Sequence, residues 1–305
     1  MLKVMRILKK INPSLVHLHV QHYYSLANIV KKVPFVLTSW GLEVETLPHA
    51  DFLRKSLAKI AATKANMVTV DAKCLQKIWI KMGIPKNKIK VIPFGVDMNI
   101  FNPNIDGSAV RRKLRIRRTD VVIISTRPFY NDHYNMECMI RAIPTILKNY
   151  ENVKFVLKGV GPLEDYLKSL TRELNVSEYV RFVGLVPFRE VAQYLAAADI
   201  YVSTCFVDST SVSLLEAMAC GLPPVVTDIP GNREWIEDGE NGFLFPPKNP
   251  TALAERVIQL IENQSLRKGF GERCFQIIKR RATWEKCVSE MKAIYESLLR
   301  TRIKR

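Results

Sequence analysis

Ten short apolar runs of strand character recur along this chain, and stretches of helical pattern separate them. Four lie in the first third, LVHLHV, FVLTSW, MVTVDA and KVIPFG, and six follow, VVIIST, KFVLKG, YVRFVG, IYVST, PPVVTD and GFLFPP. Strands that alternate with helices in this way build parallel sheets wrapped by helices. The chain is therefore predicted to be an α/β protein, and its 48% apolar and 25% charged residues fit a globular one.

The order of these runs predicts two Rossmann-like domains. Between Pro93 and Asp120 the chain is rich in Pro, Gly and Asn before a basic run, which is typical of a junction. We expect an N-terminal domain over residues 1–103, a C-terminal domain over 104–282, and an amphipathic helix over 283–305 that packs on the domains. Four strands are fewer than a Rossmann-like domain usually has. The N-terminal domain is therefore expected to be incomplete, as in a mis-started gene, a gene fragment or one part of a split enzyme.

Positive charge is concentrated in the first third of the chain. Residues 1–118 hold 22 Lys/Arg against 6 Asp/Glu, whereas residues 119–305 hold 24 against 23. Such a field attracts anionic partners, which include lipid headgroups, nucleic acid and phosphorylated substrates. The basic face formed by Lys3, Arg6, Lys9 and Lys10 favours an anionic membrane surface. No recognition helix or aromatic-basic module accompanies it, so no nucleic-acid partner is predicted.

The cysteines and the apolar runs indicate the cellular location of the protein. Six cysteines are scattered without a C-x-x-C pair, which fits reduced thiols in the cytoplasm. No apolar run approaches the ~18 residues of a spanning helix, and the N-terminal stretch lacks the features of a signal peptide. We expect a cytoplasmic protein, held peripherally on the inner face of the membrane.

The most informative pattern lies in residues 199–247, DIYVSTCFVDSTSVSLLEAMACGLPPVVTDIPGNREWIEDGENGFLFPP. Asp208 and Glu216 precede A-M-A-x-G-x-P, then G-x-x-E and G-x-L/F-x-x-P. This succession resembles the signature of family 4 retaining glycosyltransferases, which have the two-domain GT-B fold. The resemblance implies that Glu216 holds the donor ribose, because a carboxylate accepts hydrogen bonds from vicinal hydroxyls, and that Asp208 contacts the donor sugar.

A helix is predicted to start near Ser209, and its unpaired N–H groups would favour a diphosphate. The family usually has Glu at the position of Asp208 and a glycine-rich run after it. Here Ser209, Thr210 and Ser211 stand in that run. Their hydroxyls are expected to donate to phosphate oxygens at the helix start.

The segment STRPFYNDHYNMECMIRAI resembles the family's G-R-L-x-x-x-K-G-x-x-x-L-x-x-A, with Arg127 and Ala142 matching. Arg127 is predicted to clamp the diphosphate, since a guanidinium offers paired donors to phosphate oxygens. Counting back from Ala142 puts Tyr134 where the family has Lys. Tyr134, His133 or a lysine from elsewhere is left to take that role.

Two further segments, KFVLKGVGPLEDYL and YVRFVGLVPFREVAQYLAAADIYV, resemble the family's next strands. Gly159 and Gly161, with Pro162, are predicted to shape a tight turn from strand to helix. Gly184, Leu185 and Val186 are expected to lie beside the nucleotide base.

In the first domain, PSLVHLHVQHYY, PFVLTSWGLEVE and VIPFGVDMNIFNP resemble the family in order and spacing. His17 and His19 share one face of a strand, but with no third ligand in evidence we predict no metal and expect them to line the cleft between the domains. Trp40 and Glu43 stand where the family often has His and Asp. Trp40 is open to stacking on a sugar or to simple packing.

The resemblance implies transfer of a sugar from a nucleoside-diphosphate-sugar donor to an acceptor hydroxyl, with retention of configuration. No metal and no cofactor are expected, and Arg127, Asp208 and Glu216 would carry the chemistry. The acceptor would be a glycan or a lipid-linked molecule of cell-envelope polysaccharide synthesis. The alternative is a non-catalytic helper subunit that binds nucleotide sugars, or a fragment of a split glycosyltransferase.

Overall fold

Two parallel sheets make up the framework of the computed structural model, which describes residues 2–20, 24–28, 30, 33–41 and 46–303. The first sheet has the strand order β1-β2-β3-β4 and the second the order β10-β9-β8-β5-β6-β7. The α/β class with two Rossmann-like sheets is confirmed, and each of the ten apolar runs forms a strand. Their bounds are β1 Val16–Val20, β2 Phe35–Ser39, β3 Met67–Val70, β4 Ile89–Val91, β5 Val121–Ser125, β6 Val153–Leu157, β7 Val180–Phe182, β8 Ile200–Ser203, β9 Pro224–Thr227 and β10 Phe243–Phe245.

The chain divides into two compact units, Met1–Gly95 with Trp284–Arg305, and Val96–Thr283. The sequence placed the junction after residue 103, but the structure places it just before Val96. Val96 belongs to the second unit because it contacts residues far along the sequence. Its N–H donates to the Ala282 carbonyl at 2.9 Å, and it forms a parallel bridge with Thr283. The helix that follows Thr283 is part of the first unit.

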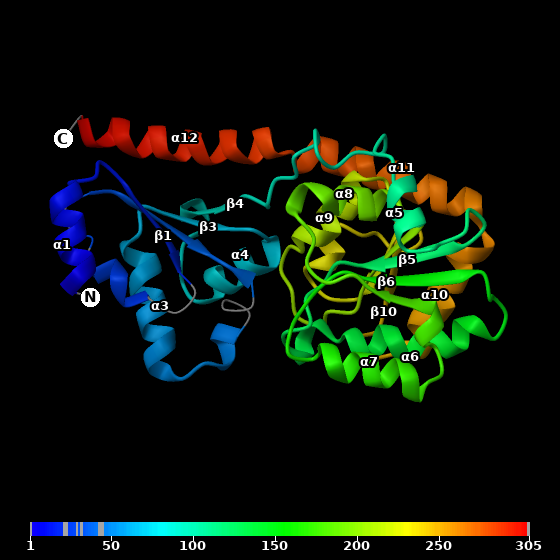
Figure 1. Cartoon of the computed structure of the whole chain (residues 1–305). Coiled ribbons are helices and arrows are strands. Elements are labelled where there is room, and N and C mark those ends of the chain that lie inside the picture. Colours follow the sequence, from blue (N-terminus) through cyan, green and yellow to red (C-terminus); the bar gives the residue numbers. More distant parts are fainter. Residues whose placement is uncertain (1, 21–23, 29, 31–32, 42–45, 304–305) are drawn as a thin grey trace. The chain divides into compact units, whose positions relative to one another are not determined.

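The second unit is a sheet covered by helices on both faces. Helices α6, α7 and α10 lie along one face, and α8, α9 and α11 lie on the other (Figure 1). Its central strands β5 and β8 are buried, as expected for a parallel sheet covered on both sides. The bounds are α5 Ser108–Lys113, α6 Met136–Leu147, α7 Glu164–Glu173, α8 Phe188–Ala196, α9 Val212–Ala219, α10 Pro250–Glu262 and α11 Gln264–Arg281.

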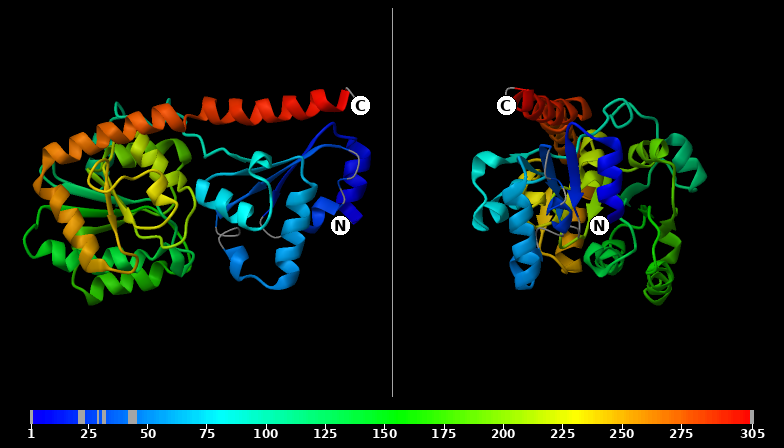
Figure 2. Two further views of the ribbon diagram at one scale, coloured as in Figure 1. Left: turned by 180° about the vertical axis from the view of Figure 1, so that it is seen from behind. Right: turned by 90° about the vertical axis from the view of Figure 1, so that its left-hand side faces the viewer.

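The first unit takes its last helix from the far end of the sequence. Helix α12 runs along this unit in Figures 1 and 2, and its Tyr295 hydroxyl lies 2.5 Å from Nδ1 of His17 on β1. Nε2 of His17 lies 2.5 Å from the Thr38 hydroxyl on β2. A polar chain therefore connects the helix to the middle of the sheet. The α-helices of this unit whose bounds the structure gives are α1 Leu2–Ile11, α3 Phe52–Lys64, α4 Lys73–Lys81 and α12 Trp284–Ile303.

Helix α1 is amphipathic and none of its residues is buried. Leu2 is 73% exposed and Ile11 67% exposed, and the helix also carries the basic residues Lys3, Arg6, Lys9 and Lys10. Among the described residues, no helix combines the length and apolar character needed to cross a membrane. The expected contact of this basic helix with an anionic membrane surface stays a prediction.

His17 makes the stability of the first unit depend on pH. Burial, together with the neighbouring charge of His19, lowers the pKa of His17 from 6.5 to about 4. Above pH 6.5 the ring is neutral whether the unit is folded or unfolded. As the pH falls from 6.5 towards 4 only the unfolded chain takes up the proton, so the free energy of unfolding decreases. With solvent screening at this half-buried ring, we expect a loss of about 1–2 kcal/mol.

Thermal unfolding followed at pH 7.5, 6 and 5 measures this effect. The His17→Gln variant should lose part of the pH dependence of the melting temperature, because glutamine does not titrate. His49→Gln is the matched control, since His49 is exposed in a short 3-10 helix of the same unit. Equal pH dependence in the parent chain and in His17→Gln would contradict the assignment.

Candidate functional site

The predicted site residues of the second unit lie at the carboxyl ends of four neighbouring strands. Asp208 follows β8, Arg127 follows β5, Gly159 follows β6 and Gly184 follows β7, and these strands are adjacent in the order β8-β5-β6-β7. The chain extends the sheet from β5 in one direction and from β8 in the other. Ligands of open α/β sheets bind at such a switch point, outside the carboxyl ends of the strands.

Arg127 is buried at this switch point, where its guanidinium donates to several side chains. Its Nη2 donates to Oδ2 of Asp208 at 2.7 Å, and its Nη1 donates to the hydroxyls of Ser211 at 2.6 Å and Ser213 at 3.1 Å. Burial opposes the charge, but the Asp208 carboxylate raises the pKa of the guanidinium above its ordinary value. The two residues that the sequence assigned to separate parts of the donor are therefore paired with each other.

Tyr134 lies against Arg127 and adds no positive charge there. It ends the 3-10 helix η4 (Asp132–Tyr134), and its ring centre is 4.8 Å from Cζ of Arg127. The next residue, Asn135, has a left-handed backbone with φ 48° at the position where the family pattern has Gly. This conformation supports the alignment that put Tyr134 at the lysine position. The His133 and Tyr134 ring centres are 4.2 Å apart. Two neighbouring rings therefore occupy the place where the family pattern has a lysine.

Helix α9 begins at Val212, so the expected start near Ser209 is wrong by a turn. The Ser211 hydroxyl caps the helix by accepting from the Leu214 N–H at 3.3 Å. Ser209, Thr210 and Ser211 are all buried in the loop before it. The Ser211 oxygen also accepts from Arg127, and its O–H has the Ser213 hydroxyl, 3.0 Å away, as a possible acceptor, so the donation to a phosphate expected from the sequence stays a prediction.

Gly231, the glycine of the G-x-x-E pattern, packs on this loop. A Cβ at Gly231 would lie 2.0 Å from the Ser209 carbonyl oxygen and 2.4 Å from that of Asp208. A residue with a side chain would have to displace the loop. The glycine therefore explains why the sequence pattern continues past the two acidic residues.

Glu216 lies in the second turn of α9 and is half-buried. Burial raises the pKa of its carboxyl from 4.5 to about 7, and the charge of Lys158 acts in the opposite direction. A ligand that donates hydrogen bonds would favour the charged form of this carboxylate. The side chain is therefore suited to take hydroxyl donors when a ligand replaces water.

The glycine turn after β6 brings the chain close to Arg127, as its sequence suggested. A Cβ at Gly159 would lie 2.4 Å from the Arg127 carbonyl oxygen, and one at Gly161 would lie 2.3 Å from the Phe129 carbonyl carbon. The Phe129 N–H donates to the Val160 carbonyl at 3.0 Å. The turn and the segment after β5 therefore lie in direct contact.

The loop after β7 is more open. Gly184 has a left-handed φ of 67°, and nothing would lie within 4 Å of a Cβ there. Leu185 is 75% exposed and Val186 is half-buried. The expected contact of these three residues with a nucleotide base stays a prediction.

Three residues of this region were not singled out from the sequence. Ser213 connects Arg127 to the buried Tyr201, whose hydroxyl lies 2.8 Å from the Ser213 hydroxyl. Lys158 follows β6 and acts on the charge of Glu216. A lysine directly before a G-x-G turn was a usable signal for Lys158, whereas the Ser213 and Tyr201 contacts depend on the fold.

In the first unit, the aromatic residues at the strand ends stack on one another. The Trp40 ring is 4.9 Å from Phe94 at an angle of 6° and 5.5 Å from His19 at 18°. Trp40 therefore packs between two rings. Glu43 lies outside the described residues. Within the ranges that the structure describes, no group of three or more His, Cys, Asp or Glu side chains is placed to hold a metal ion.

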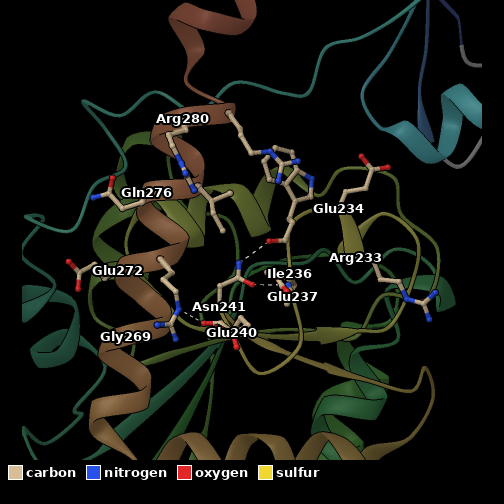
Figure 3. A pocket seen from close by; sticks show the side chains of 14 residues that line it. Arg233, Glu234, Ile236, Glu237, Glu240, Asn241, Gly269, Glu272, Gln276 and Arg280 are labelled. Atoms are coloured by element: carbon tan, nitrogen blue, oxygen red, sulfur yellow. Dashed lines mark hydrogen bonds between the residues drawn. The ribbon is translucent and has the colours of Figure 1, made fainter. Parts of the chain in front are cut away.

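A separate cavity of about 720 Å³ lies in the second unit between α11 and the segment around the 3-10 helix η6 (Asn232–Glu234) (Figure 3). None of the predicted site residues lines it. Four arginines and four glutamates surround it, so its charges balance. The lining is formed by Arg233, Glu234, Trp235, Ile236, Glu237, Glu240, Asn241, Gly269, Glu272, Arg273, Gln276, Ile277, Arg280 and Arg281.

Comparison with known proteins gives two family matches. Residues 108–276 match the family described as glycosyl transferases group 1, and residues 1–72 match the family described as glycosyl transferase 4-like. N-acetyl-alpha-D-glucosaminyl L-malate synthase of Bacillus anthracis is 24% identical over 98% of this chain and 78% of its own length. The uncharacterized glycosyltransferase MJ1607 of Methanocaldococcus jannaschii is 27% identical over 75% of this chain and 59% of its own length.

Solved structures share the fold. Anabaena Alr3699/HepE in complex with UDP superposes with a TM-score of 0.86 at 21% identity, over 97% of this chain and 81% of that one. Sucrose-phosphate synthase from Thermosynechococcus elongatus gives a TM-score of 0.83 at 20% identity, over 98% of this chain and 77% of that one. At these identities the likeness supports the fold.

Proposed function

The chain belongs to the group 1 glycosyl transferases, and from this premise we propose that it moves a sugar from a nucleoside-diphosphate donor to an acceptor hydroxyl with retention of configuration. The observation that carries the proposal is the ion pair between the buried Arg127 and the partly buried Asp208 at the switch point of the second sheet. A guanidinium held there by its partners presents a preorganised charge to a phosphate. Glu216 on α9 supplies a carboxylate for the ribose hydroxyls.

In this proposal Arg127 neutralises charge as the leaving group departs, and no metal is needed. When the donor binds, the Arg127 guanidinium donates to the diphosphate oxygens in place of Asp208. The Asp208 carboxylate is then available to the donor sugar. The donor phosphate then assists deprotonation of the acceptor hydroxyl on the face from which it leaves. The N–H groups at the start of α9 add favourable dipoles.

The neighbours narrow the choice of donor for a first experiment. Anabaena Alr3699/HepE was solved with UDP and with UDP-glucose, so UDP-sugars are the first donors to test here. The acceptor is proposed to be a glycan or a lipid-linked molecule. A second candidate, nucleotide-sugar binding without transfer, is favoured by Tyr134, because that ring leaves Arg127 without a cation at the lysine position.

The test combines binding and turnover on the whole chain. Calorimetry with UDP-, GDP- and ADP-sugars should find one class that binds, and an assay of released nucleoside diphosphate should find turnover that persists in EDTA. Binding without release on any acceptor would favour the helper function. A chain that binds no nucleotide sugar of the three classes would contradict both.

A further inference from the structure

Lys158 stands between two strand ends of the candidate site. It directly follows β6, and its backbone N–H donates to the Ser125 carbonyl of β5 at 2.9 Å. On the other side β6 pairs with β7, and the Val183 N–H donates to the Leu157 carbonyl at 3.0 Å. Lys158 therefore lies in the row of strand ends that also carries Arg127 and Gly184.

The Lys158 ammonium forms no salt bridge with a described residue, although its charge acts on a nearby carboxyl group. Within the described residues it makes no ion pair at 4.0 Å or less. Its electrostatic partner is the carboxyl of Glu216 on α9. Lys154, four residues earlier and within β6, differs, because its Nζ lies 4.4 Å from the centre of the Tyr179 ring and is attracted by the charge of Asp120. Lys154 therefore has aromatic and acidic neighbours of its own, whereas the charge of Lys158 acts on a residue of the candidate site.

The charges of Arg127, Asp208 and Glu216 at the carboxyl edge of the second sheet do not by themselves favour an anionic ligand. Arg127 and Asp208 cancel each other, and Glu216 adds a negative charge when ionised. A diphosphate entering these three groups alone would meet net repulsion in a partly desolvated site. Tyr134, at the position of the family's lysine, contributes no charge. Lys158 is the cation that the strand order places within this group.

We propose that Lys158 is the second cation of the donor site, and that its ammonium binds a phosphate oxygen of the nucleoside diphosphate between Arg127 and the Gly184 loop. The inference rests on the proposed function of this strand edge. An ammonium on a flexible stem is suited to this role, since it binds phosphate as a point charge without a fixed angle. The site then contains two cations and two carboxylates, and the phosphate no longer enters a negative field.

Calorimetry with UDP, GDP and ADP on the full chain tests the proposal, with the nucleotide that binds the parent used for the variants. Lys158→Met keeps the aliphatic stem and should weaken binding by about tenfold or more, as for loss of a charge-assisted hydrogen bond. Lys158→Arg should retain most of the affinity. Lys154→Met is the matched control and should stay within about twofold of the parent. Melting temperatures close to the parent value verify that the variants fold.

A pH series tests the electrostatic effect of Lys158 on Glu216, on which the placement of the ammonium in the site depends. Lys158 opposes the burial that raises the pKa of Glu216 to about 7. Removing the ammonium should therefore shift upward the pH below which nucleotide affinity declines. A variant with reduced affinity and an unchanged midpoint would place the ammonium away from Glu216 and overturn the assignment.

The failures of the two proposals are distinguishable. If Lys158→Met binds within twofold of the parent while Glu216→Ala loses binding, the role of Lys158 is overturned and the proposed function stands. If the parent chain binds none of the nucleoside diphosphates or their sugars, the proposed function fails, and the role of Lys158 fails with it.

Discussion

Glu216→Ala is expected to abolish measurable binding of the nucleotide sugar while the chain stays folded. The variant loses two charge-assisted hydrogen bonds to vicinal ribose hydroxyls, each worth ~1.5–3 kcal/mol, and so weakens binding by about two to four orders of magnitude. Folding should be affected less, because the carboxyl is half-buried and burial already raises its pKa to about 7. Among the described residues no hydrogen bond to the Glu216 carboxyl is found, so its removal should leave no buried polar partner unsatisfied.

Calorimetry and thermal unfolding on the same preparations measure the two effects. Glu216→Gln keeps the shape and one acceptor, so its affinity should lie between those of the parent and the alanine variant. Glu255→Ala, which changes an exposed carboxylate on α10, is the control for a general charge effect. Unchanged affinity of Glu216→Ala for every nucleotide sugar that the parent binds would remove the ribose assignment.

Arg127→Ala is expected to lower turnover at saturating donor by about a hundredfold to a thousandfold. Losing a preorganised donor aimed at the developing charge costs ~2.7–4 kcal/mol of transition-state stabilisation. The apparent donor KM should rise much less, because the contact strengthens as the leaving group departs. Steady-state kinetics with the donor identified by calorimetry measure both quantities.

The structure adds a control that this experiment needs. Arg127 pairs with Asp208 at 2.7 Å, so the alanine variant also leaves a partly buried carboxylate without its partner and should melt earlier. Arg127→Lys keeps the charge and should fold normally with intermediate turnover. Tyr134→Lys should be tolerated or raise turnover, because it places an ammonium beside the guanidinium. Near-parental turnover of a folded Arg127→Ala at saturating donor would mean that the clamp lies elsewhere.

The sequence predicted the strands well because parallel strands buried on both faces are continuous apolar runs. VVIIST shows this, since Val122 to Ser125 of β5 are all buried and turn-forming residues follow. Helix starts are harder to predict from residue type. Ser209 and Ser211 are equally able to cap a helix, and the hydrogen bond from Leu214 to Ser211 decides between them.

The pairing inside the site was beyond the sequence. Arg127 and Asp208 are 81 positions apart, and nothing in either motif states that they touch. The domain junction shows the same limit, because Val96 joins the second unit through a partner at Ala282. The place of Lys158 at the site could in principle have been predicted from the sequence. It needed the register between β5 and β6, which places the residue after Leu157 beside the end of β5.

The first unit is discontinuous in sequence, and this reverses the order in which the units can be completed during synthesis. Residues 96–283 are all made before α12, so the second unit can fold as soon as they leave the ribosome. Until α12 follows, β1 and β4 lack its Tyr295 and Glu290, which contact His17 and Lys90. The part that is translated first is therefore the last to mature, and a released chain that ends at Thr283 should already protect the second unit from proteases.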